Sequence, residues 1–203
     1  MRPLLLIILI AFSYSTHAQS AERKLSKAVQ KVYSEYKLYF DSSLLAEYIV
    51  LDKQKSYLIN SGTQKIKTIA LADDSFVFDE FSLTFAFVYK GDTVIRFPRC
   101  RLDTDQHLMA LGTPGNPVRH GDALPPYMQL VKGNIKFDYK KLKTLLNKMK
   151  LETTETSLQS FDAGKEGKKE YRWVVTTSCP DLKCRQLQIA ADDGKILADI
   201  KPE

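Results

Sequence analysis

The chain is poor in the residues from which metal and nucleotide sites are built. Its 203 residues include three histidines and three cysteines, and these do not form the two Cys/His pairs that a structural zinc site needs. It contains neither a phosphate-binding P-loop nor a Gly-x-Gly-x-x-Gly motif. After residue 12, no apolar run is long enough to cross a bilayer. We therefore expect no metal, no cofactor and no membrane span in the processed chain.

The composition is typical of a soluble globular protein. Hydrophobic residues make up 44% of the chain and charged residues 27%, which excludes collagen, a coiled coil, a polytopic membrane protein and wholesale disorder. Thirty basic residues against 24 acidic ones give a formal charge of +6. In an exported protein this mild excess favours anionic envelope surfaces over nucleic acid as a partner. The alternative is that the charge serves solubility alone.

The first 18 residues have the pattern of a secretory signal peptide. Arg2 supplies the positive charge, and residues 4–12 are continuously apolar. Residues 16–18, Thr-His-Ala, place small residues at the two positions that a signal peptidase reads. We expect cleavage after Ala18 and a protein that is secreted or periplasmic.

The two later cysteines are spaced for a disulfide. Cys179 and Cys184 enclose Pro-Asp-Leu-Lys, a turn sequence, between two segments that alternate like strands. We expect a disulfide that closes this hairpin in an oxidising compartment. The alternative is a redox-active or metal-binding pair, although the spacing is not Cys-x-x-Cys.

Cys100 is left without an expected partner. It lies between Arg99 and Arg101, whose positive charges would lower the pKa of a thiol and make Cys100 a candidate nucleophile. The alternative is a buried, small apolar residue.

The order of elements predicts an α+β fold. We expect a helix packed on an antiparallel sheet in an N-terminal unit, residues 19–111, and again in a C-terminal unit, residues 135–203. The N-terminal helix covers residues 20–40, where apolar residues recur at helical spacing. The strands expected after it cover residues 48–51, 57–59, 64–72, 82–89 and 94–97.

The C-terminal unit begins with a lysine-rich helix. Asp138 is the expected N-cap of a helix over residues 139–150. Four strands follow, over residues 153–161, 169–177, 185–190 and 195–200. Residues 85–105 and 173–193 share a strand-turn-strand pattern of equal length, which suggests a duplicated unit. Unrelated hairpins give the same pattern.

A connecting segment over residues 112–134 is the candidate contact surface. Its first sixteen residues contain three glycines and four prolines, a density at which we expect no regular element. It carries Arg119, His120, Asp122 and Tyr127, a polar set with one aromatic ring. Long ordered loops are often functional, and the alternative is a plain linker.

The helix over residues 139–150 carries five lysines and no acid. Lys140, Lys141 and Lys143 are the residues that we expect to contact an anionic lipid or glycan surface. The alternative is an ordinary solvated helix face.

The end of the chain resembles a PepSY domain. Residues 190–197, Ala-Ala-Asp-Asp-Gly-Lys-Ile-Leu, correspond to that family's last hairpin turn, and residues 171–175, Tyr-Arg-Trp-Val-Val, suit the preceding strand. The resemblance covers residues 138–203, although Ala190 replaces the family's leading Asp. It implies a non-catalytic module that holds or restrains protein partners, including peptidases. The sequence therefore predicts an exported, non-enzymatic binding or inhibitory module that acts on an envelope or extracellular protein.

A second resemblance supports an enzyme instead. Residues 48–62 are similar to the opening strands of L,D-transpeptidase catalytic domains, and His120-Gly121 and Ser178-Cys179 are similar to their catalytic segments. Such an enzyme would attack a peptidoglycan peptide through Cys179 or Cys100, activated by His120. Against this, the separation of His120 and Cys179 is longer than in that family, and Pro180 interrupts the nucleophile segment.

Overall fold

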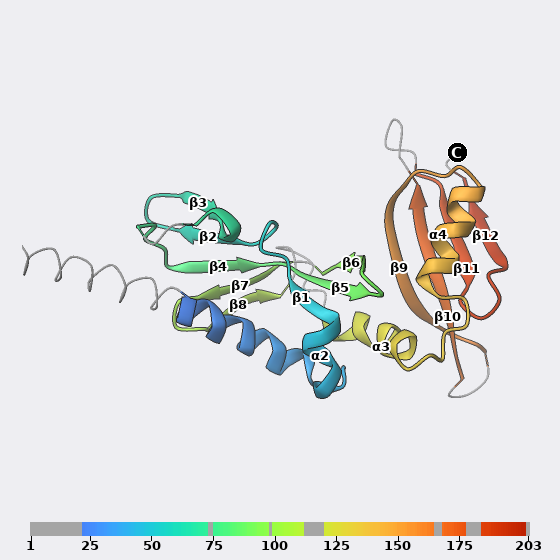
Figure 1. Ribbon diagram of the computed structural model, residues 1–203, viewed down its shortest axis with the longest axis horizontal. Helices are drawn as coiled ribbons and strands as arrows, with labels where there is room; N and C mark the ends of the chain where they lie inside the picture. The colour runs from blue at the N-terminus through green and yellow to red at the C-terminus, as the bar shows by residue number, and fades with distance from the viewer. Residues whose placement is uncertain are drawn as a thin grey trace, which may run out of the picture. The chain divides into compact units, whose positions relative to one another are not determined.

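The computed structural model describes residues 22–72, 75–97, 99–111, 120–164, 168–177 and 184–201 (Figure 1). The described residues form helices and three antiparallel sheets, so the predicted α+β class is confirmed. The chain divides into two units, which we describe separately. The first unit comprises Met1–Leu38, Val50–Phe85 and Phe97–His120, and the second comprises Tyr39–Ile49, Ala86–Arg96 and Gly121–Glu203. The expected signal peptide, residues 1–18, lies outside the described residues.

The first unit is built on a five-stranded antiparallel sheet. Its order is β3-β2-β4-β7-β8. The strands are β2 (Tyr57–Asn60), β3 (Lys65–Thr68), β4 (Glu80–Leu83), β7 (Cys100–Asp103) and β8 (Leu108–Leu111). A short 3₁₀ turn, η1 (Ile69–Leu71), follows β3. The sequence did not predict β7 or β8, and it extended β3 through the η1 residues.

One face of this sheet carries the core of the first unit. In the register of β4 and β7, Phe81 lies opposite Leu102 and Leu83 opposite Cys100, and all four side chains are buried. A helix over residues 22–36, shorter than the predicted 20–40, contributes Ala28, Val32 and Tyr36 at a spacing of four residues.

Aromatic contacts fasten this helix within the first unit. The rings of Tyr33 and Tyr36 pack against Phe85 at centroid distances of 5.7 and 5.8 Å, and Tyr36 also packs against Phe97 at 5.9 Å. The tilted and edge-to-face geometries are those that aromatic pairs prefer. Tyr36, which is 1% exposed, is therefore part of the core of the first unit.

The second unit contains a hairpin with a two-residue turn. Strands β5 (Phe85–Tyr89) and β6 (Asp92–Arg96) pair so that Tyr89 lies opposite Asp92, in a sheet of order β1-β5-β6 with β1 (Ile49–Leu51). Lys90 and Gly91 have φ of +52° and +86°, the geometry that suits a tight hairpin. Helix α2 (Ser42–Tyr48), which the sequence did not predict, precedes β1 and is capped by Asp41.

The second unit also contains a helix on a four-stranded meander. Helix α4 (Tyr139–Lys148) has the predicted N-cap, because the Asp138 carboxylate accepts a hydrogen bond from the Lys141 backbone N–H at 3.1 Å. The sheet has the order β12-β11-β10-β9 (Figure 1). Its strands are β9 (Thr153–Asp162), β10 (Lys169–Thr177), β11 (Gln186–Ala190) and β12 (Ile196–Ile200), within one residue of the predicted bounds.

The expectation of no regular element over residues 112–127 is wrong for residues 120–127, whereas residues 112–119 lie outside the described residues. Helix α3 spans His120–Val131 and contains Pro125 and Pro126. Each proline removes one helical hydrogen bond, at a cost of up to about 3 kcal/mol in a helix interior. The apolar face outweighs this cost, because Leu124, Tyr127, Met128 and Leu130 are all buried.

Helix α3 ends at a glycine in the left-handed conformation. Gly133 has φ of +76°, and the backbone N–H of Asn134 donates to the Gln129 carbonyl at 3.0 Å. This is the left-handed cap with which many helices end.

Each of the two compact units is assembled from several stretches of chain, and three of the boundaries between these stretches fall within β1, within β5 and within a helix over His120–Val131. The division into domains 19–111 and 135–203 stays a prediction. The two similar segments also differ: residues 85–105 include β5, β6 and β7, which belong to two different sheets, whereas the described part of residues 173–193 includes parts of β10 and β11, which belong to one sheet.

Candidate functional site

The residues predicted for the contact surface have different positions. Arg119 lies outside the described residues, and His120 and Asp122 lie in the first turn of α3, where the structure does not describe their side chains. Tyr127 is only 1% exposed and its ring packs against Phe87 at 4.8 Å. In this position Tyr127 has a structural role instead of the predicted contact role.

Tyr127 covers an edge of the four-stranded sheet. Its hydroxyl oxygen accepts a hydrogen bond from the Leu158 backbone N–H of β9 at 3.0 Å. Burial raises the pKa of Tyr127 far above its ordinary value, so the phenol stays neutral. Because β9 is an edge strand, this bond satisfies a donor that would otherwise be open to another strand.

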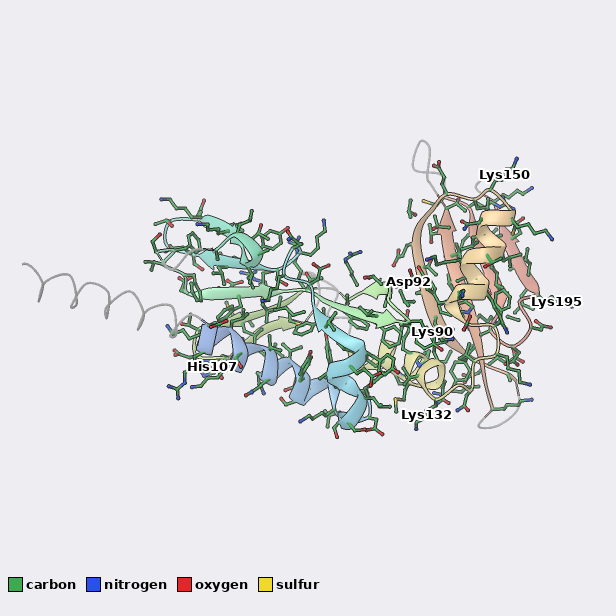
Figure 2. All side chains as sticks on the ribbon, viewed as in Figure 1. Lys90, Asp92, His107, Lys132, Lys150 and Lys195 are labelled. Carbon is green, nitrogen blue, oxygen red and sulfur yellow. The ribbon has the colours of Figure 1, made fainter. Side chains whose placement is uncertain are left out.

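A hollow of about 370 Å³ lies between the turn of the β5–β6 hairpin and α4 in the second unit. We call it the lysine hollow. It is lined by Tyr89, Lys90, Asp92, Tyr139, Lys140, Lys143, Thr144 and Asn147. Figure 2 labels Lys90 and Asp92 at the hairpin.

Two ion pairs join the hairpin to the helix segment beside the hollow. Lys90 Nζ lies 2.8 Å from Asp138 Oδ2, and Lys143 Nζ lies 2.8 Å from Asp92 Oδ1. The hydrogen bond to Asp138 raises the pKa of Lys90, and the hydrogen bond to Asp92 raises the pKa of Lys143. Both lysines therefore stay charged at neutral pH.

Asp138 has two roles at this site. Burial favours the neutral acid, but the hydrogen bonds from Lys90 and from the Lys141 backbone together outweigh it and hold the pKa of Asp138 below its ordinary value. The same carboxylate caps α4 and fixes the hairpin lysine.

The lining carries an excess of positive charge. The lining contains three lysines and one carboxylate, that of Asp92, and a second carboxylate, that of Asp138, pairs with Lys90 beside the hollow. Three positive and two negative groups leave a formal charge of +1. Lys140 forms no ion pair within the part of the chain that the structure describes. Lys90 also lies over the Tyr89 ring at 5.0 Å and Lys143 over the Tyr139 ring at 5.9 Å.

The three lysines predicted to meet an anionic surface are separated by the structure. Lys140 and Lys143 line the lysine hollow, whereas the Lys141 ammonium donates to the Lys136 carbonyl at 2.7 Å. Sequence reasoning missed the hairpin residues Tyr89, Lys90 and Asp92. The sequence predicted strands over residues 82–89 and 94–97 on either side of this turn, but no local signal indicates that the turn meets a helix about fifty residues later.

The last strand of the second unit is exposed on both faces. Among the described residues β12 pairs only with β11, and Ile196, Leu197 and Ile200 are 39%, 44% and 51% exposed. Exposed lysines flank the strand at positions 195 and 201, and Figure 2 labels Lys195.

Cys100 lies in the core of the first unit. Its side chain is 0% exposed and its sulfur lies 3.8 Å from the Tyr36 hydroxyl. Burial raises the pKa of the Cys100 thiol to about 12, so the expected lowering by its arginine neighbours is wrong. The physical reason is strand alternation, which directs Arg101 to the opposite face of the sheet.

On that opposite face Arg101 is held by a buried carboxylate. Both oxygens of Glu80, on the neighbouring strand β4, accept hydrogen bonds from the Arg101 guanidinium. Glu80 is 2% exposed, and a buried carboxylate needs such a partner. The pair is a structural link between β4 and β7.

The predicted disulfide involves a residue outside the described ones. Cys179 is not described, and Cys184 lies exposed at the start of the segment that leads into β11. The ladder of β10 and β11 reaches this point, because the Thr177 backbone N–H donates to the Arg185 carbonyl at 3.0 Å. The pairing of Cys179 with Cys184 stays a prediction, because Cys179 lies outside the described residues.

The described residues contain no helix with the length and apolar character of a membrane span. They also contain no group of three or more His, Cys, Asp or Glu side chains arranged to hold a metal ion. In comparisons with family models, with curated proteins and with solved structures, the chain shows no match.

Proposed function

We propose that the chain is an exported, non-enzymatic binding module that holds an extended segment of another envelope or extracellular protein along β12. The observation that carries this proposal is the exposed edge of β12, with three apolar side chains that are 39–51% exposed. An open strand edge offers backbone donors and acceptors to an added strand, and the side chains beside it supply selectivity.

The two edges of the four-stranded sheet differ in a way that favours β12. At the β9 edge, the Tyr127 hydroxyl already takes the Leu158 N–H. The inner strands provide a rigid support, since Trp173, Val175, Leu187 and Ile189 are fully buried. A strand added to β12 would therefore extend a sheet that is already ordered.

The charges beside β12 indicate the chemistry of the partner. The one acid of the strand, Asp199, is neutralised by a two-pronged contact with Arg185 at 2.7 and 2.8 Å. Lys195 and Lys201 at the two ends have no such partner among the described residues. The complementary segment is an extended peptide with apolar residues at its centre and acidic residues at its ends.

Export and the absence of catalysis are supported by the sequence. The signal peptide pattern of residues 1–18 supports export, and the PepSY resemblance of residues 138–203 supports a module that restrains a protein partner. The alternative cysteine enzyme is weakened at Cys100, whose burial and raised pKa do not suit a nucleophile. The enzyme alternative therefore requires Cys179 as the nucleophile and His120 as the residue that activates it.

The proposal is tested by peptide selection. A displayed library of random peptides is panned against the immobilised processed chain, and we expect enrichment of peptides with an apolar centre and acidic ends. Replacing Leu197 and Ile200 with Lys should abolish this enrichment. The matched control is Met109→Lys, which removes an exposed apolar side chain from β8 of the first unit.

Hydrogen exchange provides the readout specific to strand addition. An enriched peptide should slow the exchange of β12 amides in the wild-type chain. Enrichment that survives the β12 substitutions, or binding without β12 protection, would refute the proposal.

A further inference from the structure

The lysine hollow is a second site with its own chemistry, separate from the β12 edge. Its volume of about 370 Å³ lies within the range of about 300–1,000 Å³ that is usual for small-molecule sites. Its lining combines positive charge, two phenol rings and short polar side chains, whereas β12 offers backbone groups and aliphatic side chains.

The cations of the hollow converge from two elements. Lys140 and Lys143 are three residues apart on α4 and therefore lie on one face of the helix. Lys90 comes from the hairpin turn and is fixed by Asp138. Because Lys143 is paired with the carboxylate of Asp92, Lys140 is the lysine best able to bind an incoming anion.

The aromatic residues give the hollow apolar walls. Tyr139 is half-buried and packs on Trp173 at a centroid distance of 5.8 Å, which fixes its position. Burial raises the pKa of Tyr139, so its hydroxyl remains a hydrogen-bond donor. Tyr89 adds a second ring from the end of β5. Such rings accept the C–H faces of a sugar, and their hydroxyls bond to its oxygens.

The remaining lining residues suit hydroxyl groups. Asp92 accepts hydrogen bonds, Thr144 can both donate and accept, and the Asn147 amide does both. A simple phosphate or sulfate would use the lysines but leave these groups without a role.

We propose that the lysine hollow binds an acidic saccharide of one or two rings. The sugar carboxylate lies at Lys140 and Lys143, and the ring packs against Tyr139 and Tyr89. A lipid surface fits the hollow less well, because the large exposed aliphatic side chains in the described part of the second unit lie on β12 and not beside these lysines.

The experiment uses the only tryptophan of the chain as a reporter. Trp173 contacts Tyr139, so a ligand against Tyr139 should change Trp173 fluorescence. The processed chain is titrated with glucuronic acid and with glucose at the same pH and salt. We expect a saturable change with glucuronic acid and at least tenfold weaker binding of glucose, because glucose lacks the charged group.

One substitution isolates the proposed contact. Lys140→Gln removes a charge that has no ion-pair partner among the described residues, so the fold should be unaffected. We expect about tenfold weaker glucuronic acid binding, the usual effect of losing a charged hydrogen bond. The matched control is Lys148→Gln, which makes the same charge change on α4 outside the hollow and should leave binding unchanged.

Each other outcome overturns the proposal. Inorganic phosphate that competes as tightly as glucuronic acid would show a plain anion site. Binding to phosphatidylglycerol vesicles that depends on Lys140, with no response to glucuronic acid, would show a lipid site. Equal losses in Lys140→Gln and Lys148→Gln would show that overall charge, and not the hollow, attracts the sugar.

Discussion

The turn between β11 and β12 depends on a glycine that leaves room for an aromatic ring. Gly194 has φ of +82°, and a Cβ added there would lie 2.3 Å from Phe137 Cε2 and 2.6 Å from Cδ2. Both backbone groups of Phe137 are hydrogen-bonded. Its N–H donates to the Ala191 carbonyl at 2.9 Å, and its carbonyl accepts from Trp173 Nε1 at 2.8 Å. The ring, not the backbone, must therefore move in Gly194→Ala.

Two terms set the expected loss of stability in Gly194→Ala. The left-handed backbone costs an alanine about 1 kcal/mol. Turning the half-buried Phe137 ring out of its contact loses part of the roughly 1.5–3 kcal/mol that a fully buried phenylalanine contributes. We expect the free energy of unfolding to fall by about 2–3 kcal/mol.

Gly91→Ala is the matched control. Gly91 lies in the same unit with φ of +86°, but an added Cβ would meet nothing within 4 Å. Only the backbone term applies, so the expected loss is about 1 kcal/mol. Urea unfolding followed by the fluorescence of Trp173, the only tryptophan, measures both variants.

The difference between the two variants decides the argument. Equal losses in Gly194→Ala and Gly91→Ala would refute the role assigned to the Phe137 ring. A double-mutant cycle with Phe137→Leu should recover part of the loss in Gly194→Ala, because the smaller side chain leaves room for the Cβ.

Three further results are expected. Tyr127→Phe leaves the buried Leu158 N–H without an acceptor and should lower the free energy of unfolding in urea by about 1–2 kcal/mol. Asp138→Ala should lower it by about 1 kcal/mol through the lost cap, and Asp138→Asn by less, because Asn also caps helices. Because the pKa of Asp138 is lowered in the folded chain, its ion pair with Lys90 contributes fully to stability above about pH 4. This contribution is lost as the pH falls through the folded-state pKa of Asp138. The free energy of unfolding of Asp138→Asn should therefore depend less on pH in that range. Cys100 should resist a thiol reagent in the native chain and react in denaturant, and fast native reaction would contradict its burial.

Local patterns predicted the C-terminal part of the fold well. The strands β9 to β12 alternate clearly between turns, and Asp138 is a strong cap, so residues 138–200 could be assigned from sequence. Helix α3 could not, because two prolines oppose it locally and only the burial of Leu124, Tyr127 and their neighbours stabilises it. Burial is a property of the whole unit, not of the segment.

The candidate site was predicted only in part. Lys140 and Lys143 stood out as a charge run, but the hollow needs the β5–β6 hairpin beside them, and contacts between distant segments leave no local pattern. Cys100 was placed between two arginines by sequence, yet strand alternation sends neighbouring side chains to opposite faces. The charges of its neighbours in the sequence therefore gave the wrong direction for the pKa shift of this thiol.

The buried thiol of Cys100 has a consequence for how the chain matures. Three cysteines allow three pairings, and two of them would use Cys100. In an oxidising compartment these wrong bridges can form only while the first unit is open, since disulfide exchange needs access to the sulfur. If the chain is exported and the predicted bridge between Cys179 and Cys184 forms, packing of the helix over residues 22–36 against Cys100 would favour that bridge over the other two pairings. We then expect its yield to depend on the first unit closing before oxidation is complete.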